Sequence, residues 1–179
     1  MHHQTVDQLE SGLDKVRQSP KDHGALEMIV SRPETGHREF MEQAELCLQA
    51  GLVGDNWSLR NTGPAPAHPD RQLAIMNARA ATLIAASRDR WSLAGDQLYL
   101  DLDLSHRNLP AGTRLSIGSA VIEITAEPHT GCQKFVERFG ADAMRFVNSP
   151  VGRSLNLRGT FARIFQPGVI HVGDVVSRV

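Results

Sequence analysis

Residues 98–125 read LYLDLDLSHRNLPAGTRLSIGSAVIEIT, and this stretch decides the expected fold. Leucine recurs at every second position from Leu98 to Leu104, which predicts a strand with one buried face. A turn over residues 110–113 follows, and two more strands are expected around Gly118, one at Leu115 and Ile117 and one at residues 121–125. Short strands joined by Gly and Pro turns are typical of a mainly β, β-barrel-like or α+β domain, and not of an alternating βαβ chain.

The same signals continue outward on both sides of this stretch. Further strands are predicted at residues 25–31, 73–76, 161–165 and 175–179. Helices are predicted at residues 6–18, 38–50, 78–87, 133–139 and 141–147. Their expected caps and breaks are Thr5 with Gln8, Gly51, Asn77 and Gly140. A long loop is expected after residue 54, with an irregular core at residues 61–70.

The composition is that of an ordinary globular domain. The chain has 179 residues, 41% hydrophobic and 22% charged, which is long enough for one core and short for two. A formal net charge of −1 gives no reason to propose a nucleic-acid partner, and no apolar run predicts a signal peptide or a membrane span. The two cysteines, Cys47 and Cys132, do not make a disulfide framework, so a reducing, cytoplasmic location is expected.

Charge is unevenly distributed along the chain. Residues 1–55 contain ten acidic and five basic side chains, whereas residues 129–163 contain six basic and two acidic ones. A basic segment within a nearly neutral protein suits a small anionic ligand better than a polymer. A solvated helix face explains the same charges, and the sequence leaves both interpretations open.

One dense polar motif, PHTGCQKF at residues 128–135, lies between a predicted strand and a predicted helix. Cys132 is expected near the helix N-terminus, where the helix dipole favours the thiolate, and Lys134 adds positive potential. His129 pairs with the thiolate if the turn brings it close. A buried, inert cysteine is the alternative, and it is the expected state of Cys47 on an apolar helix. Cys132 is therefore expected to react faster with alkylating agents than Cys47.

Together with later segments, this motif resembles the MOSC domain, a family named for the C-terminal domain of molybdenum cofactor sulfurases. The matching pieces are residues 51–55, 112–118, 128–135, 138–142, 146–148, 157–159, 167–170 and 173–174. The resemblance implies a β-barrel-like fold, similar to the β-barrel domain of pyruvate kinase, with peripheral helices. It implies one MOSC domain at residues 25–179, preceded by an N-terminal helical extension at residues 1–24.

The resemblance also implies a cysteine that carries sulfur as a persulfide or ligates molybdenum in the molybdenum cofactor, molybdopterin. Cys132 is the firm match for that catalytic and metal-ligating cysteine, and Arg158 is the preferred ligand for the pterin phosphate. The candidate cofactor-binding residues are Cys132, Lys134, Asn148, Arg158 and Arg71. The fused sulfurases carry a pyridoxal-phosphate domain for which this chain has no room. Its partner is therefore expected to be a cysteine desulfurase or a redox protein.

Three functions stay open at this point. The first is a molybdenum-cofactor-binding or sulfur-carrier protein, in a system for cofactor sulfuration or a molybdenum-dependent reductase. The second is a cysteine-dependent hydrolase or transferase with His129 as the base, for which the sequence shows neither an orienting group nor an oxyanion site. The third is a non-catalytic interaction module with an incidental thiol. Whether the chain is itself an enzyme is left undecided.

Overall fold

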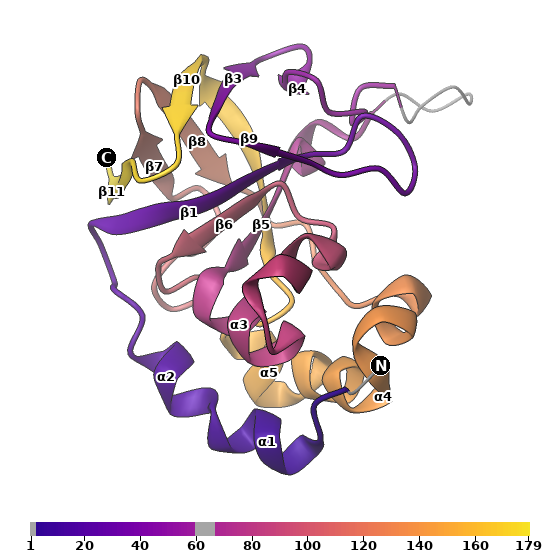
Figure 1. The fold of residues 1–179 in the computed structure, drawn as a ribbon. Helices are drawn as coiled ribbons and strands as arrows, with labels where there is room; N and C mark the ends of the chain where they lie inside the picture. The colour runs from indigo at the N-terminus through magenta and orange to yellow at the C-terminus, as the bar shows by residue number, and fades with distance from the viewer. Residues whose placement is uncertain (1–2, 60–66) are drawn as a thin grey trace.

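A closed β-barrel forms the centre of the computed structural model, which describes residues 3–59 and 67–179 (Figure 1). Seven strands follow one another around it in the order β11-β7-β8-β9-β5-β6-β1, and pairing of β1 with β11 closes the ring. All neighbours are antiparallel except β5 and β6, which are parallel. The strands are β1 (Gly24–Ser31), β5 (Leu73–Asn77), β6 (Leu98–Asp101), β7 (Arg114–Ile117), β8 (Ala120–Ile124), β9 (Thr160–Gln166) and β11 (Val175–Arg178). The predicted mainly β, α+β fold is confirmed.

The helices gather on one side of this barrel (Figure 1). They are α1 (Val6–Ser11), α2 (Leu13–Arg17), α3 (Ala78–Ala85), α4 (Gln133–Asn148) and α5 (Pro150–Ser154), with the 3-10 helix η2 (Arg88–Ala94). The other 3-10 helix, η1 (Pro69–Arg71), lies beside β9. One apolar cluster fills the barrel, and a second lies beneath the helices. Strand β6 is buried on both faces because it separates the two clusters, so the predicted single buried face is wrong. The strand also ends at Asp101, before the leucine pattern ends.

The N-terminal helix is divided in two. Thr5 forms the predicted capping box with Gln8, but the helix expected over residues 6–18 breaks at Gly12. A Cβ atom at Gly12 would lie 2.2 Å from a methyl group of Leu83, so the absence of a side chain at Gly12 allows close packing on α3. Side chains of α1 and α2 share the helical cluster with α3 and α4. The domain boundary at residue 24 stays a prediction.

The helix predicted at residues 38–50 is wrong. The segment forms β2 (Glu39–Met41) and β3 (Gln43–Cys47), and β4 (Gly51–Leu52) follows. Strand β2 pairs with β1 outside the ring, while β3 lies between β4 and β10 (Gly168–His171) in a separate three-stranded sheet. Gly51 turns β3 into β4 with a φ of +74°, instead of ending a helix. Cys47 accordingly lies half-buried on a strand and not on an apolar helix.

The helix after the cysteine agrees with expectation. It is interrupted at Gly140, whose φ of +89° divides it at the predicted position. Of the predicted irregular core, residues 61–66 lie outside the described residues, and Pro69–Arg71 forms the η1 turn. Among residues 3–59 and 67–179, no helix has both the length and the apolar character needed to cross a membrane.

Candidate functional site

A cavity of about 370 Å³ opens where β8 ends and β9 begins, on the side covered by α4 and α5. The loop after β8 contributes His129 and Thr130, α4 contributes Asn148, and Arg158 enters from the segment before β9. The structure therefore brings together three of the residues predicted from sequence, His129, Asn148 and Arg158. Cys132, Lys134 and Arg71 do not line this cavity.

Arg158 is anchored by a buried carboxylate that the sequence interpretation missed. Its Nη1 donates to Asp96 Oδ2 at 2.8 Å, and its Nη2 donates to the carbonyl oxygen of Ala94 at 2.9 Å. Both side chains are almost fully buried, and the guanidinium lies 5.1 Å from the centre of the Phe135 ring. Burial raises the pKa of the Asp96 carboxyl, and the charge and hydrogen bond of Arg158 act in the opposite direction.

His129 lies against the other oxygen of the same carboxylate. Its Nδ1 is 3.6 Å from Asp96 Oδ1, and its ring packs on Phe161 with 4.2 Å between ring centres. Burial holds the pKa of His129 well below its usual value, and the positive charge of Arg158 lowers it further. The imidazole is therefore neutral at pH 7, so its contact with Asp96 is not an ion pair.

The free energy of unfolding should consequently fall as the pH drops below about 6.5, the ordinary imidazole value. Between the pKa of His129 in the folded protein and its value of about 6.5 in the unfolded chain, the unfolded chain binds a proton at this residue and the folded protein does not. The contribution of His129 to the free energy of unfolding is therefore fully present above about pH 6.5 and decreases as the pH falls toward the folded pKa. One proton gives a slope of at most about 1.4 kcal/mol per pH unit. Urea unfolding at pH 5–8 measures it. His129→Gln should remove this component, whereas His37→Gln, at an exposed position, should keep it.

Cys132 stands at the N-cap of α4, as predicted, and its side chain is exposed. Its thiol makes no hydrogen bond with any residue in the described part of the chain, so the anticipated pairing with His129 is not formed here. Lys134, also exposed, has no partner among the same residues. The thiol is thus accessible and free to bind an incoming group.

The two other predicted ligands are already engaged with the protein. Asn148 Nδ2 donates to Met144 Sδ at 3.4 Å at the edge of the cavity. Arg71 lies elsewhere, where its Nε and Nη2 donate to Glu127 Oε2 at 2.9 and 2.7 Å. Arg71 therefore contacts the loop that leads to the motif, and its guanidinium also lies 5.7 Å from the centre of the Phe161 ring, on which His129 packs.

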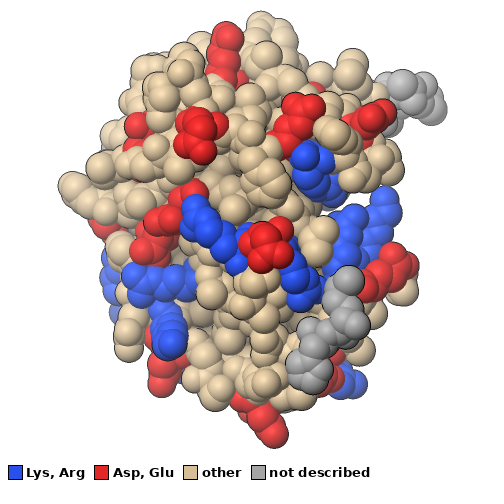
Figure 2. Space-filling model, in the orientation of Figure 1, with Lys and Arg blue, Asp and Glu red and all other residues tan. Residues whose placement is uncertain are grey.

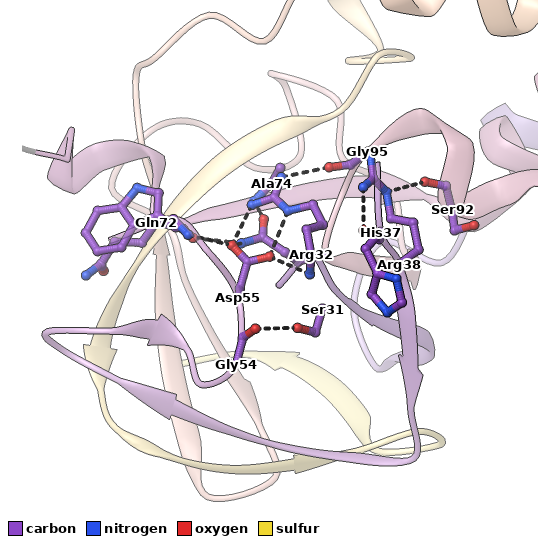
Figure 3. A network of polar contacts seen from close by, with 12 residues as sticks. Ser31, Arg32, His37, Arg38, Gly54, Asp55, Gln72, Ala74, Ser92 and Gly95 are labelled. Carbon is purple, nitrogen blue, oxygen red and sulfur yellow. Dashed lines mark hydrogen bonds and ion pairs between the residues drawn. The ribbon is translucent and has the colours of Figure 1, made fainter. Parts of the chain in front are cut away.

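A second buried network fixes the turn before β6, which carries Asp96 (Figure 3). Arg32 Nε and Nη2 donate to the two oxygens of Asp55 at 2.8 and 2.9 Å, and its Nη1 donates to the carbonyl oxygen of Gly95 at 2.8 Å. Gln97 Nε2 donates to the same Asp55 carboxylate at 3.3 Å. These contacts hold the turn before β6 against β1 and so position the Asp96 side chain.

Comparisons with known proteins agree with this architecture. The family model of the MOSC domain matches residues 63–177. The YuaD protein from Bacillus subtilis aligns with a TM-score of 0.63 at 14% identity, covering 86% of this chain and 93% of that one. YiiM from Escherichia coli aligns with a TM-score of 0.57 at 19% identity, covering 87% and 69%. No match is found among curated proteins.

Proposed function

This chain belongs to the MOSC domain family, and from that membership we propose that it binds or passes on a molybdenum cofactor through Cys132. The observation that carries the proposal is the exposed thiol of Cys132, which has no partner in the described residues. The same loop lines the cavity with His129 and Thr130 two to three positions earlier. A ligand seated in the cavity would therefore contact the same loop that carries the free thiol.

The residues present fit such a group. Thiolate is a soft ligand that suits molybdenum, and arginine suits the phosphate of a pterin. Three buried polar atoms beside the cavity have no hydrogen-bond partner within residues 3–59 and 67–179: Asp96 Oδ1, His129 Nδ1 and Arg158 Nε. Asp96 Oδ1 and His129 Nδ1 lie 3.6 Å apart and face one another, so Arg158 Nε is the atom for which a bound ligand or an ordered water is the expected partner.

Each residue has a distinct part in this proposal. Cys132 Sγ ligates the metal or holds a persulfide, and Arg158 and Asn148 line the cavity beside the pterin. His129 stays neutral, so Nδ1 or Nε2 carries one proton and the other nitrogen accepts a hydrogen bond. Lys134 adds positive charge near the thiol. When bound, the cofactor would supply a molybdenum centre for sulfur or electron exchange with a desulfurase or redox partner.

Loading the protein with molybdenum cofactor and measuring pterin and molybdenum separately tests the proposal. The parent should retain both, because the thiol and the cavity act together. Cys132→Ser should retain about tenfold less molybdenum than the parent, because the soft ligand is gone, and it should keep its pterin. Cys47→Ser, which changes the other thiol, should behave as the parent does. In the metal-free parent, iodoacetamide should label Cys132 faster than Cys47. A parent that retains neither component, or a Cys132→Ser variant that retains both, would refute the proposal.

A cysteine-dependent hydrolase or transferase is the second candidate, favoured by one observation. Asp96, 3.6 Å from His129 Nδ1, supplies the orienting group that the sequence did not reveal. Within the described residues, however, no hydrogen bond joins Cys132 to His129. Thioester hydrolysis by the metal-free protein, lost in both Cys132→Ser and His129→Gln, would favour this candidate over cofactor binding.

A further inference from the structure

Four consecutive backbone carbonyls in the turn before β6, residues 92–95, each accept a hydrogen bond from a different arginine. The pairs are Ser92 with Arg38 Nε (3.3 Å), Leu93 with Arg138 Nη1 (2.7 Å), Ala94 with Arg158 Nη2 (2.9 Å) and Gly95 with Arg32 Nη1 (2.8 Å). Arg32 and Arg38 come from the loop between β1 and β2, Arg138 from α4, and Arg158 from the segment before β9. One short turn therefore gathers four positive charges from distant parts of the chain.

Only two of the four arginines are neutralised. Arg32 pairs with Asp55, and Arg158 pairs with Asp96. Arg38 and Arg138 have no carboxylate partner in residues 3–59 and 67–179, and they donate only to backbone carbonyls. Arg38 makes a second bond of this kind, from Nη1 to the carbonyl oxygen of His37 at 2.7 Å. Both side chains are partly buried. Two unpaired guanidinium groups in such a place repel one another, so an anion would be attracted there.

The two free guanidinium groups converge beside Gly95. Arg38 Nη2 and Arg138 Nη1 each lie 3.9 Å from the point that a Cβ atom of Gly95 would occupy. Gly95 has a φ of +91° and no side chain to fill that space. Burial lowers the pKa of Arg38, and the positive charges of Arg138 and Arg32 act in the same direction. Lys and Arg side chains cross the middle of this face of the molecule toward its right edge, with Asp and Glu side chains among them (Figure 2).

We propose that Arg38 and Arg138 together bind the phosphate group of a small organic ligand beside Gly95. Guanidinium groups bind phosphate oxygens through paired, charge-assisted hydrogen bonds, and both groups still have free N–H donors. This assigns the phosphate to a different pair from Arg158, whose guanidinium is held by Asp96. The anion site itself does not depend on the proposed function, and only the identification of its ligand as the pterin of the cofactor rests on that function. Arg138 follows Cys132 by six residues on α4, a rise of roughly 9 Å, so one ligand can contact both.

The test titrates inorganic phosphate into the Cys132→Ser protein, replacing sodium chloride so that ionic strength stays constant. The backbone amide of Gly95, followed by NMR, should shift saturably in this protein. Arg38→Gln and Arg138→Gln should each weaken phosphate binding roughly tenfold or more, because a charge-assisted hydrogen bond is lost. Arg138→Lys should restore part of it. Arg145→Gln removes the same charge from the same helix, but Arg145 is exposed and paired with Asp142, so it is the matched control.

Unchanged amide signals elsewhere establish that each variant is folded. Absence of a saturable Gly95 shift before any arginine is changed would overturn the proposal, as would equal weakening by Arg145→Gln. In a second experiment, the Arg138→Gln variant with Cys132 unchanged is loaded with molybdenum cofactor, and the bound pterin is measured. Loss of both phosphate and pterin identifies pterin phosphate as the ligand. Loss of phosphate with retained pterin supports the anion site but overturns the pterin as its occupant. If phosphate binds but the parent protein, with Cys132 intact, retains neither pterin nor molybdenum, this anion site stands and the proposed function is refuted instead.

Discussion

Asp96→Ala is expected to lower the free energy of unfolding by roughly 3–5 kcal/mol at pH 7, because it leaves the buried Arg158 guanidinium without its counter-charge. The Asp96 side chain is fully buried and its bond to Arg158 is 2.8 Å long, so water cannot replace the carboxylate without opening the structure. The loss also removes the group against which His129 Nδ1 lies. Denaturant unfolding followed by circular dichroism measures the effect.

Two comparisons make this expectation specific. Asp101→Ala breaks the partly exposed pair with Arg79 and should cost about 1 kcal/mol or less. The double replacement Asp96→Leu with Arg158→Met should recover much of the stability lost in Asp96→Ala, since both buried charges are then absent. If Asp96→Ala costs no more than Asp101→Ala, the buried pair is not what holds the turn before β6 to the segment before β9.

Local sequence patterns predicted most of the barrel. The strands that begin at Leu73, Arg114, Ala120 and Thr160 were predicted to within one or two residues because their apolar side chains alternate or form short runs between turn residues. Cys132 and its N-cap position were equally visible, since a strand, a glycine and a helical pattern surround it. Features decided by neighbours in sequence were therefore accessible without coordinates.

The segment at residues 38–50 shows where such patterns fail. Its apolar residues fit helical spacing, yet Ala44 and Leu46 are buried at alternate positions of β3 because they pair with β10. That partner lies more than 120 residues later in the chain, so no local window contains it. Tertiary pairing overrode the apparent helical preference.

Asp96 and the arginines around it were missed for the same reason. Asp96 and Arg158 are 62 positions apart, and Arg38 and Arg138 are 100 apart, so their contacts exist only once the barrel closes. One local signal was available: Asp96 stands two positions before an apolar strand, where the chain is already buried. A carboxylate at such a position requires a cationic partner, and Arg158 was already a candidate for function.

The last expected effect is at Gly159, which adjoins Arg158. Its φ is +111°, a conformation that side-chain-bearing residues rarely adopt. A Cβ atom there would lie 2.3 Å from the carbonyl oxygen of Ile75 and 3.0 Å from His129 Nδ1. Ile75 is held by pairing of β5 with both β6 and β9, so its carbonyl cannot retreat. Gly159→Ala should therefore lower the free energy of unfolding by about 3 kcal/mol or more, combining backbone strain with overpacking.

Gly112→Ala separates those two contributions. Gly112 has a similar φ of +90°, but nothing lies within 4 Å of the position its Cβ would take. Its replacement should therefore show the strain alone, about 1–2 kcal/mol. The excess cost of Gly159→Ala measures the close approach to Ile75 and His129, and it should be accompanied by a displaced NMR signal of the His129 ring. Equal costs for the two variants and an unmoved ring signal would mean that Gly159 is needed for its backbone conformation only, and that the cavity wall formed by His129 is not packed against it.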